Sequence, residues 1–594
     1  MQDTAPNIKK INLCKCFRLC WDASLVWFSC ILLITLAGLV TPYLQIISIA
    51  EFIDTALNIL NHNVKMSQII QPILLVIFVL AYNQLGNKVA AVIWLKIELE
   101  LKQRLSLSII EKYASLKYSY IENPEVLNRI KWVSDETEVK ICKSVRNILE
   151  SLLLGMRVAT VILLIFSKSP MTAVLISAVI IPLIYLAVKV GNIIYKKDVK
   201  VAEEKRKYDY YNNVLGSREC ADERNLFQYS GFMTRKWEDY YDEFRKLDLK
   251  AYMNSNLRIE SGSIVTAVMS ILIALILLVP YYQGVITIGL FMSVMTSVFE
   301  LIESMSFQFV FKINDMVQNY KFRKDFNYFL SLEEEPGARD PACGDIKFES
   351  LEFVDLSFKY PGTNTYILND LSMRLEAGKH YAFVGLNGAG KTTITKLLLG
   401  LYREYEGEIL LNGKELREYP LSSLKGLYGV VFQDFAKYEI SLWDNIKLGA
   451  GVNNREKEEL FQISGVKDII DNLPDKENTM LGKLADNGSD LSNGQWQRIA
   501  LARAIIGNKE VHILDEPTAA LDPLMESRIY DEFSRISKER TTILISHRLG
   551  STKLADIIYV IAQGKVIEHG THLDLMDQKA VYAEMFEKQR RWYE

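Results

Sequence analysis

The chain has 594 residues, which suggests several domains, because a single hydrophobic core stops growing near roughly 250–300 residues. Its composition excludes a disordered, collagen-like or small disulfide-stapled protein, and its net charge of −3 gives no reason to expect nucleic acid as a partner. A mean hydropathy of +0.07 hides an uneven distribution, since nearly all long apolar runs lie before about residue 310.

Seven cysteines are too few and too scattered for a disulfide framework. Cys14, Cys16 and Cys20 cluster near the start of the chain, but no fourth ligand or nearby histidine completes a metal site. We interpret them as reduced thiols beside a membrane.

Six apolar runs are long enough to cross a membrane, whose hydrocarbon core of about 30 Å needs roughly 20 helical residues. They are Leu25–Ala50, Ile69–Trp94, Ile148–Ser167, Met171–Val190, Ser261–Tyr281 and Ile286–Val310. The first run is too long for a signal peptide and lacks a small-residue cleavage site. The expected fold of this part is a membrane α-helical bundle of six transmembrane helices.

Basic residues predict the orientation of these spans. The connections after the first, third and fifth spans are short and hold few basic residues, whereas those after the second and fourth are long and basic. The last of these contains Lys196, Lys197, Lys200, Lys205, Arg206 and Lys207. Because cytoplasmic connections carry the excess of positive charge, both termini are expected in the cytoplasm.

Arg157 lies inside the third span, ten residues before its outer end, and therefore about 15 Å deep at a helical rise of ~1.5 Å per residue. An ionisable side chain at that depth is usually paired or lines a wet cavity. Two interpretations stay open: Arg157 faces a central translocation cavity, or it forms a structural ion pair.

Two prolines, two glycines and an acidic run over residues 331–345 predict a linker. The expected organisation is a cytoplasmic segment over residues 1–24, a six-helix transmembrane domain over 25–330, this linker, and a cassette over 346–594. The motifs of the cassette predict an α/β P-loop NTPase fold.

An apolar strand over Tyr381–Val384 leads directly into a complete G-x-x-x-x-G-K-T loop and then a helical run. The loop comprises Gly385, Leu386, Asn387, Gly388, Ala389, Gly390, Lys391 and Thr392, followed by Thr393. Its glycines let backbone N–H groups wrap the β- and γ-phosphates, and the helix N-terminus adds a favourable dipole. Lys391 supplies a cation to the phosphates and the Thr392 hydroxyl can ligate Mg²⁺, so ATP and Mg²⁺ are the expected cofactors.

A second apolar strand, Val511–Leu514, ends in two carboxylates. Asp515 suits an Mg²⁺ ligand, and Glu516 suits the base that activates the attacking water. His512 lies within the strand and is interpreted as a core histidine, not a catalyst.

Between these segments, the sequence L-S-N-G-Q over residues 491–495 opens another helix. The P-loop, this L-S-x-G-Q sequence and the strand I-L-D-E-P, in that order, resemble the ATP-binding cassette (ABC) ATPases. Six spans before one cassette resemble an ABC exporter half-transporter, a group that includes bacterial lipid flippases, multidrug exporters and peptide exporters. The resemblance covers essentially the whole chain.

The resemblance implies further site residues. They are Tyr360 (stacking on adenine), Gln433 (sensing the γ-phosphate and Mg²⁺), Ser492, Gly494 and Gln495 (signature contacts to nucleotide), Asp522 (contacting the opposite cassette) and His547 (holding the γ-phosphate). Two positions depart from the family. Asn493 stands where the first signature glycine is usual, and Leu481-Gly482-Lys483 stands where exporters commonly have a glycine–glutamate pair.

In this family each ATP site combines the P-loop of one cassette with the signature of another. The resemblance therefore implies a second half-transporter as partner, with an identical copy favoured over a different chain. The other expected partners are membrane lipid and the substrate, with no nucleic acid.

The expected function is ATP-driven export of an amphipathic substrate, whether peptide, lipid or drug-like compound, across a bacterial cytoplasmic membrane by alternating access. Cassette closure is expected to reach the membrane helices through cytoplasmic turns near Ser119–Pro124 and Glu219–Arg224. The alternative is an ATP-gated regulatory or channel-associated ABC protein that does not itself pump.

Overall fold

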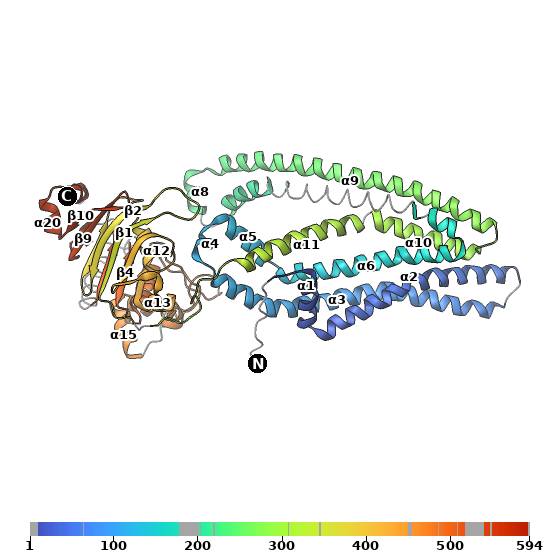
Figure 1. Cartoon of the computed structure of the whole chain (residues 1–594), viewed down its shortest axis with the longest axis horizontal. Helices are drawn as coiled ribbons and strands as arrows, with labels where there is room; N and C mark the ends of the chain where they lie inside the picture. Colours follow the sequence, from blue (N-terminus) through green and yellow to red (C-terminus); the bar gives the residue numbers. More distant parts are fainter. Residues whose placement is uncertain are drawn as a thin grey trace. The chain divides into compact units, whose positions relative to one another are not determined.

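The computed structural model describes residues 10–62, 65–175, 177–178, 201, 204–217, 220–306, 308–343, 346–448, 454–484, 486–507, 509–516, 540–546 and 549–591. The chain forms two compact units (Figure 1). The first comprises Met1–Lys112 and Asn128–Leu332, and the second comprises Tyr113–Leu127 and Glu333–Glu594. A short segment from the first half of the chain thus packs with the second half.

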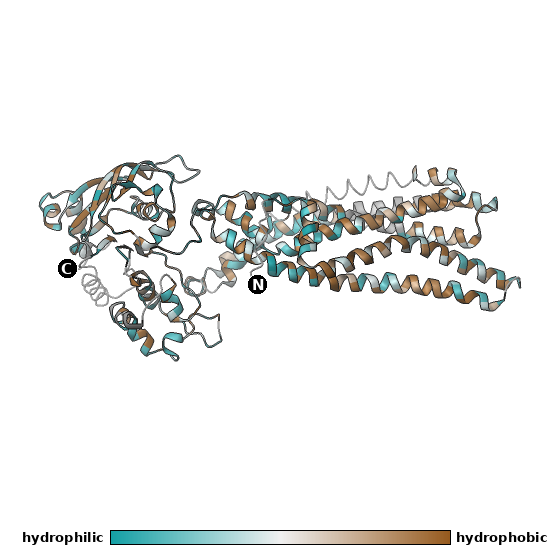
Figure 2. Ribbon diagram, turned by 60° about the horizontal axis from the view of Figure 1, so that its bottom comes forward, coloured by the Kyte–Doolittle hydropathy of each residue, from teal (hydrophilic) through white to brown (hydrophobic). Residues whose placement is uncertain are grey.

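The first unit is built from long helices. They are α1 (Leu13–Ala23), α2 (Leu25–Leu60), η1 (Met66–Ile69), α3 (Ile70–Ala114), α5 (Pro124–Ser134), α6 (Thr137–Lys168), α8 (Ala221–Phe227), α9 (Ser230–Tyr282), α10 (Ile288–Ser306) and α11 (Gln308–Ser331). Apolar residues cover much of their length (Figure 2). A buried cluster formed by α2, α6, α9 and α10 holds the bundle together.

Within the described part of the chain, three segments are long and apolar enough to cross a membrane: Leu25–Leu60, Met66–Ala114 and Thr137–Lys168. They contain the first three predicted spans, which are thereby confirmed as helices. At most 22% of the apolar window in each is buried, as expected for helices whose outer faces contact lipid. Two shorter apolar segments follow: Ile271–Tyr282 overlaps the fifth predicted span, and Ile288–Glu300 lies within the sixth.

Some sequence predictions fall on undescribed residues. Most of the fourth predicted span, Met171–Val190, lies outside the described residues, and so do Lys196, Lys197 and Lys200.

The second unit contains two β-sheets. The first is antiparallel with the order β2-β1-β4-β5 and comprises β1 (Ser350–Phe358), β2 (Leu368–Glu376), β4 (Glu406–Leu411) and β5 (Lys414–Glu415). The second has the order β10-β9-β3-β8-β7-β6 and comprises β3 (His380–Val384), β6 (Tyr428–Val431), β7 (Val511–Asp515), β8 (Thr541–Ile545), β9 (Ile557–Ala562) and β10 (Lys565–Gly570). Among the described strands of the second sheet, β10 pairs antiparallel and the others pair parallel.

Helices complete the second unit. They are α4 (Tyr118–Glu122), α12 (Lys391–Leu398), η2 (Leu416–Glu418), α13 (Leu421–Leu427), α14 (Leu442–Lys447), α15 (Asn454–Ile463), α16 (Lys467–Asp471), η3 (Lys476–Asn478), α17 (Asn493–Ile505), α19 (Leu549–Thr552), α20 (His572–Asp577) and α21 (Val581–Arg590). Helices α14 to α17 share a core of their own with the ends of β6, β7 and β8.

Strands β7 and β8 are buried at every residue and largely apolar, because a parallel sheet is covered on both faces. Because the carboxyl ends of parallel strands meet at one edge, β3, β6 and β7 deliver the segments that follow them to the same place. This edge positions the candidate site.

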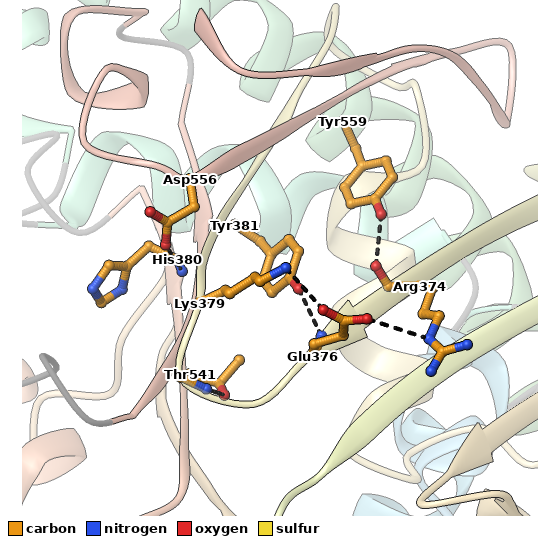
Figure 3. A network of polar contacts seen from close by, with 9 residues as sticks. Arg374, Glu376, Lys379, His380, Tyr381, Thr541, Asp556 and Tyr559 are labelled. Carbon is orange, nitrogen blue, oxygen red and sulfur yellow. Dashed lines mark hydrogen bonds and ion pairs between the residues drawn. The ribbon is translucent and has the colours of Figure 1, made fainter.

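A polar network fixes the opposite, amino-terminal end of β3 (Figure 3). The Tyr381 hydroxyl accepts a hydrogen bond from the Glu376 N–H at 2.6 Å, and the His380 N–H donates to Asp556 Oδ2 at 2.8 Å. Lys379 pairs with the Glu376 carboxylate at 2.8 Å. These contacts fix the start of β3 to β2 and to the segment before β9. The strand can therefore position the loop that follows its other end.

Candidate nucleotide site of the cassette

The predicted P-loop occupies the turn between β3 and α12 and depends on close backbone approach. A Cβ on Gly385 would lie 2.1 Å from the Ile561 carbonyl oxygen, so no larger residue fits there. Gly390 has a φ of 103°, which favours glycine, and a Cβ there would lie 2.6 Å from Leu368 Cδ2. These glycines keep the loop backbone open for phosphate oxygens.

Lys391, the first residue of α12, is 6% exposed. Its Nζ donates hydrogen bonds to the carbonyl oxygens of Gly385 and Leu386 at 2.8 and 3.1 Å. Burial lowers the pKa of Lys391, while the nearby Glu516 and Asp515 carboxylates act in the opposite direction. The ammonium group is therefore held directly against the loop that would bind phosphate.

Asp515, the last residue of β7, is 1% exposed. Neither of its carboxylate oxygens has a hydrogen-bond partner of good geometry among the described residues. Burial raises the pKa of Asp515 to about 6, an effect that the neighbouring Thr392 hydroxyl opposes and the Glu516 charge reinforces. A buried carboxylate with so little hydrogen bonding is costly, and together with the Thr392 hydroxyl it offers the oxygen ligands that Mg²⁺ prefers. These residues fit Mg²⁺.

Glu516 follows β7 with a φ of 49°, a left-handed conformation that is unusual for a residue with a side chain. Two hydrogen bonds hold this backbone turn: the Glu516 N–H donates to the Ile545 carbonyl at 2.9 Å, and the Glu516 carbonyl accepts from Gln497 Nε2 at 3.3 Å. Strained turns of this kind cluster at functional sites. Sequence reasoning did not identify Gln497, although it lies on the helix that the L-S-N-G-Q sequence opens.

Gln433 is exposed and follows β6 by two residues. Because Val431 pairs with Leu514, the segment after β6 leaves the sheet beside Asp515. Tyr360 lies near the start of α12, where its hydroxyl is 3.0 Å from the Thr393 hydroxyl. The remaining predicted residues, Asp522 and His547, lie outside the described residues.

The signature sequence begins helix α17 with a capping box. The Ser492 hydroxyl accepts from the Gln495 N–H at 3.3 Å, and Gln495 Oε1 accepts from the Ser492 N–H at 2.8 Å. Such reciprocal capping satisfies two N–H groups at a helix start. The Gln495 side chain thus has a structural role in this chain.

Asn493, which departs from the family pattern, is also held. Lys437 Nζ donates to Asn493 Oδ1 at 2.7 Å, and Lys437 lies only four residues after Gln433. Sequence reasoning did not identify Lys437, because nothing in the local pattern links it to residue 493. At the other departure, Lys483 forms an ion pair with Asp490 at 3.5 Å, just before the signature.

Helix α4 belongs to the predicted turn at Ser119–Pro124 and packs within the cassette unit. Lys396 Nζ lies 2.6 Å from Glu122 Oε1, and the Tyr402 hydroxyl donates to the other oxygen of the same carboxylate. Lys396 also lies 5.3 Å from the centre of the Tyr360 ring. A short series of contacts therefore connects Tyr360 with Glu122. Of the second predicted turn, Glu219 lies outside the described residues, and Arg224 belongs to α8.

Comparison with known proteins supports this site. The ABC transporter family matches residues 368–519. The subtilin transport ATP-binding protein SpaT of Bacillus subtilis is 28% identical over 563 residues, which cover 93% of this chain and 90% of that protein. The ATP-dependent lipid A-core flippase of Pseudomonas aeruginosa is 39% identical over 237 residues, 40% of this chain and 39% of that protein, so this alignment spans under half of the flippase.

A solved structure shares the whole architecture. The structure of a bacterial Atm1-family ABC exporter with ATP bound superposes with a TM-score of 0.76 at 21% identity, covering 95% of this chain and 98% of the other. This likeness shows the exporter fold, an apolar helical part followed by a nucleotide-binding cassette. Residues 368–519 therefore form an ABC transporter domain, and the chain as a whole has the fold of an ABC exporter.

Proposed function

We propose that two copies of this chain form an exporter that moves an amphipathic compound out of the bacterial cytoplasm at the cost of ATP hydrolysis, with both termini in the cytoplasm. The observation that carries the proposal is the buried Asp515 carboxylate beside Lys391 and Thr392, in a cassette joined to membrane-spanning helices. Relatives named for subtilin transport and for lipid A-core flipping support an amphipathic substrate, either peptide or lipid.

The residues of the site divide the work of hydrolysis. The N–H groups of the P-loop and Lys391 bind the β- and γ-phosphates, Tyr360 stacks on adenine, and Glu516 accepts the proton of the attacking water. Thr392, Asp515 and Gln433 would hold Mg²⁺, and the bound ion would neutralise charge on the phosphates. His547 binds the γ-phosphate.

A homodimer is the simplest assembly that completes the site. One chain carries the P-loop, the two carboxylates and the signature, so two identical copies provide two full sites, with Ser492 and Gly494 of one copy facing the nucleotide of the other. Asp522 contacts the opposite cassette. Closure of this dimer reaches the membrane helices through the turns at Ser119–Pro124 and Glu219–Arg224.

Glu516→Gln tests the hydrolysis step. The amide keeps the shape of the side chain but cannot accept the proton, so ATPase activity in lipid nanodiscs should fall by roughly 100-fold or more while ATP still binds and particle mass still reports two copies. Substantial remaining hydrolysis would reject Glu516 as the base.

Transport itself is tested with inside-out membrane vesicles that contain the chain. ATP-dependent accumulation of a fluorescent amphipathic compound, absent in Glu516→Gln, supports export. An ATPase that is active in these vesicles without any accumulation, but that changes the conductance of a co-purified protein, would instead support the gating alternative.

A further inference from the structure

A cavity of about 420 Å³ lies inside the first unit, between α2, α3, α6 and α11. This volume falls within the range of ~300–1,000 Å³ that is usual for small-molecule sites. Its lining includes Thr35 and Gly38 from α2, Tyr82 and Asn87 from α3, and Leu153 and Arg157 from α6. Hydroxyl and amide groups at membrane depth give this wall a polar character that lipid-facing positions lack.

Arg157 lines this cavity. Among the residues that the structure describes, its guanidinium makes no hydrogen bond and no ion pair, and the side chain is exposed. The structural ion pair considered from the sequence is therefore not formed with any described residue. A charge at this depth needs either water or an anion beside it, and the cavity provides room for both.

A second charged group lies on the same wall. Glu150 accepts a hydrogen bond from Arg146 at 2.8 Å and forms an ion pair with Lys312 of α11. One carboxylate thus faces two cations. Adding Arg157, the charged groups that line the cavity carry an excess of two positive charges.

Helix α6 arranges these charges around an apolar stretch. Arg146, Glu150 and Arg157 are spaced by four and seven residues, which places them on one helical face. Leu153 and Leu154 line the cavity between the charges. At ~1.5 Å per residue, Arg157 lies roughly 10 Å along the helix from Glu150. One wall of the cavity can therefore contact both the apolar body and the charged end of a bound molecule.

We propose that this cavity binds the acidic head group, a carboxylate or a phosphate, of an amphipathic molecule, with Arg157 as its partner. Arginine presents paired N–H donors that match both anions, and such charge-assisted contacts are strong when water is scarce. The inference rests on the proposed function for the identity of the bound molecule as the export substrate, but binding does not require transport.

Binding is measured on the full chain in nanodiscs of phosphatidylcholine, without ATP. The probe is 11-(dansylamino)undecanoic acid, and its primary amide is the neutral match with the same apolar body. We expect the acid to bind at least ten-fold more tightly than the amide, about 1.4 kcal/mol. Equal affinities for acid and amide would overturn the proposal.

Three variants separate a direct contact from a structural effect. Arg157→Ala should weaken binding of the acid about ten-fold and leave binding of the amide unchanged. Arg157→Lys should retain only part of the preference for the acid, because lysine keeps the charge but not the paired donors. Lys168→Ala removes the same charge from the end of α6, away from this cavity, and should change neither affinity. A loss of acid binding in Lys168→Ala equal to that in Arg157→Ala would contradict the assignment.

A further arm identifies the source of the anion. If phosphatidylglycerol in the nanodisc displaces the acid from the chain but not the amide, the head group belongs to a lipid; displacement only by the soluble dansyl-undecyl phosphate assigns it to a soluble compound. Either result supports an anion site. Acid that binds but is not accumulated by vesicles leaves this site standing and rejects export, whereas accumulation of acid and amide alike rejects this site and leaves export standing.

Discussion

At the scale of single residues, Asn493 shows how a departure from a family pattern can be accommodated. Lysine can only donate, so the contact with Lys437 places the Asn493 oxygen toward the ammonium group and leaves the Asn493 Nδ2 donors available. Where the family usually has a glycine without a side chain, this chain has the Asn493 amide, oriented by the Lys437 ammonium group. An anion on the partner cassette would find two favourable groups there.

Lys437→Met tests this arrangement. Without the cation the amide is no longer oriented, and we expect a roughly five- to ten-fold loss in kcat/KM for ATP, about 1–1.4 kcal/mol, with Lys437→Arg close to the parent chain. The measurement is Mg²⁺-dependent ATPase activity in nanodiscs. If Lys437 acts through Asn493, the same substitution in an Asn493→Gly background should have little further effect; an equal loss in both backgrounds would show that Lys437 acts independently.

His512 is a residue whose effect is on stability and not on catalysis. It is 1% exposed within β7, and burial, helped by the positive charges of Arg540 and Lys509, lowers its pKa to about 3. Below pH 6.5 the unfolded chain binds a proton at this residue but the folded chain does not, so folding loses stability as the pH falls from 6.5 towards 3. The sequence-based interpretation as a core histidine agrees with this burial.

His512→Leu should therefore flatten the acid side of the stability profile. Between pH 7.5 and pH 5 the variant should lose about 2 kcal/mol less than the parent chain, because each pH unit below 6.5 corresponds to ~1.4 kcal/mol. The melting temperature of the cassette in detergent, followed by intrinsic fluorescence at both pH values, reports the difference. Parallel profiles for the two chains would contradict the assignment of the acid sensitivity to His512.

At the scale of elements, α4 is short and gains its position from contacts with the cassette. The ion pair between Lys396 and Glu122 is joined by the ring contact of Tyr118 with Tyr402, whose centroids are 5.6 Å apart in a T-shaped arrangement. Burial lowers the pKa of Lys396, but the hydrogen bond with Glu122 and the electrostatic effects of Tyr360 and Tyr118 outweigh burial, so the pKa of Lys396 is raised. The charged form is thus favoured where α4 meets α12.

Glu122→Ala should uncouple hydrolysis from transport. Loss of this carboxylate removes the partner of Lys396 and Tyr402, at a cost of about 1 kcal/mol after allowance for solvent screening. We expect basal ATPase activity within about two-fold of the parent chain, with stimulation by a transported compound reduced several-fold. Glu125→Ala, an exposed carboxylate at the start of α5, is the matched control and should leave stimulation intact. A parallel loss in both variants would reject a specific role for Glu122.

At the scale of the whole molecule, the sequence predicted those features that depend on residues close together in the chain. A G-x-x-x-x-G-K-T loop needs its glycines wherever it occurs, as Gly385 and Gly390 show, and a membrane span needs a continuous apolar run. Contacts between distant segments carry no such signal. The pairing of Lys437 with Asn493 and the cavity around Arg157 depend on which segments the fold brings together, and only the structure reveals them.

The division of the chain also has a consequence for how it is made and handled. The segment Tyr113–Leu127 is translated long before Glu333–Glu594, the region with which it packs. During synthesis this segment therefore lacks its packing partner. A cassette produced alone from residue 333 lacks the segment, and the Tyr402 ring, only 6% exposed in the full chain, becomes more exposed to water. An isolated cassette of this protein should therefore tend to aggregate. Fusing residues 113–127 to it should restore its solubility.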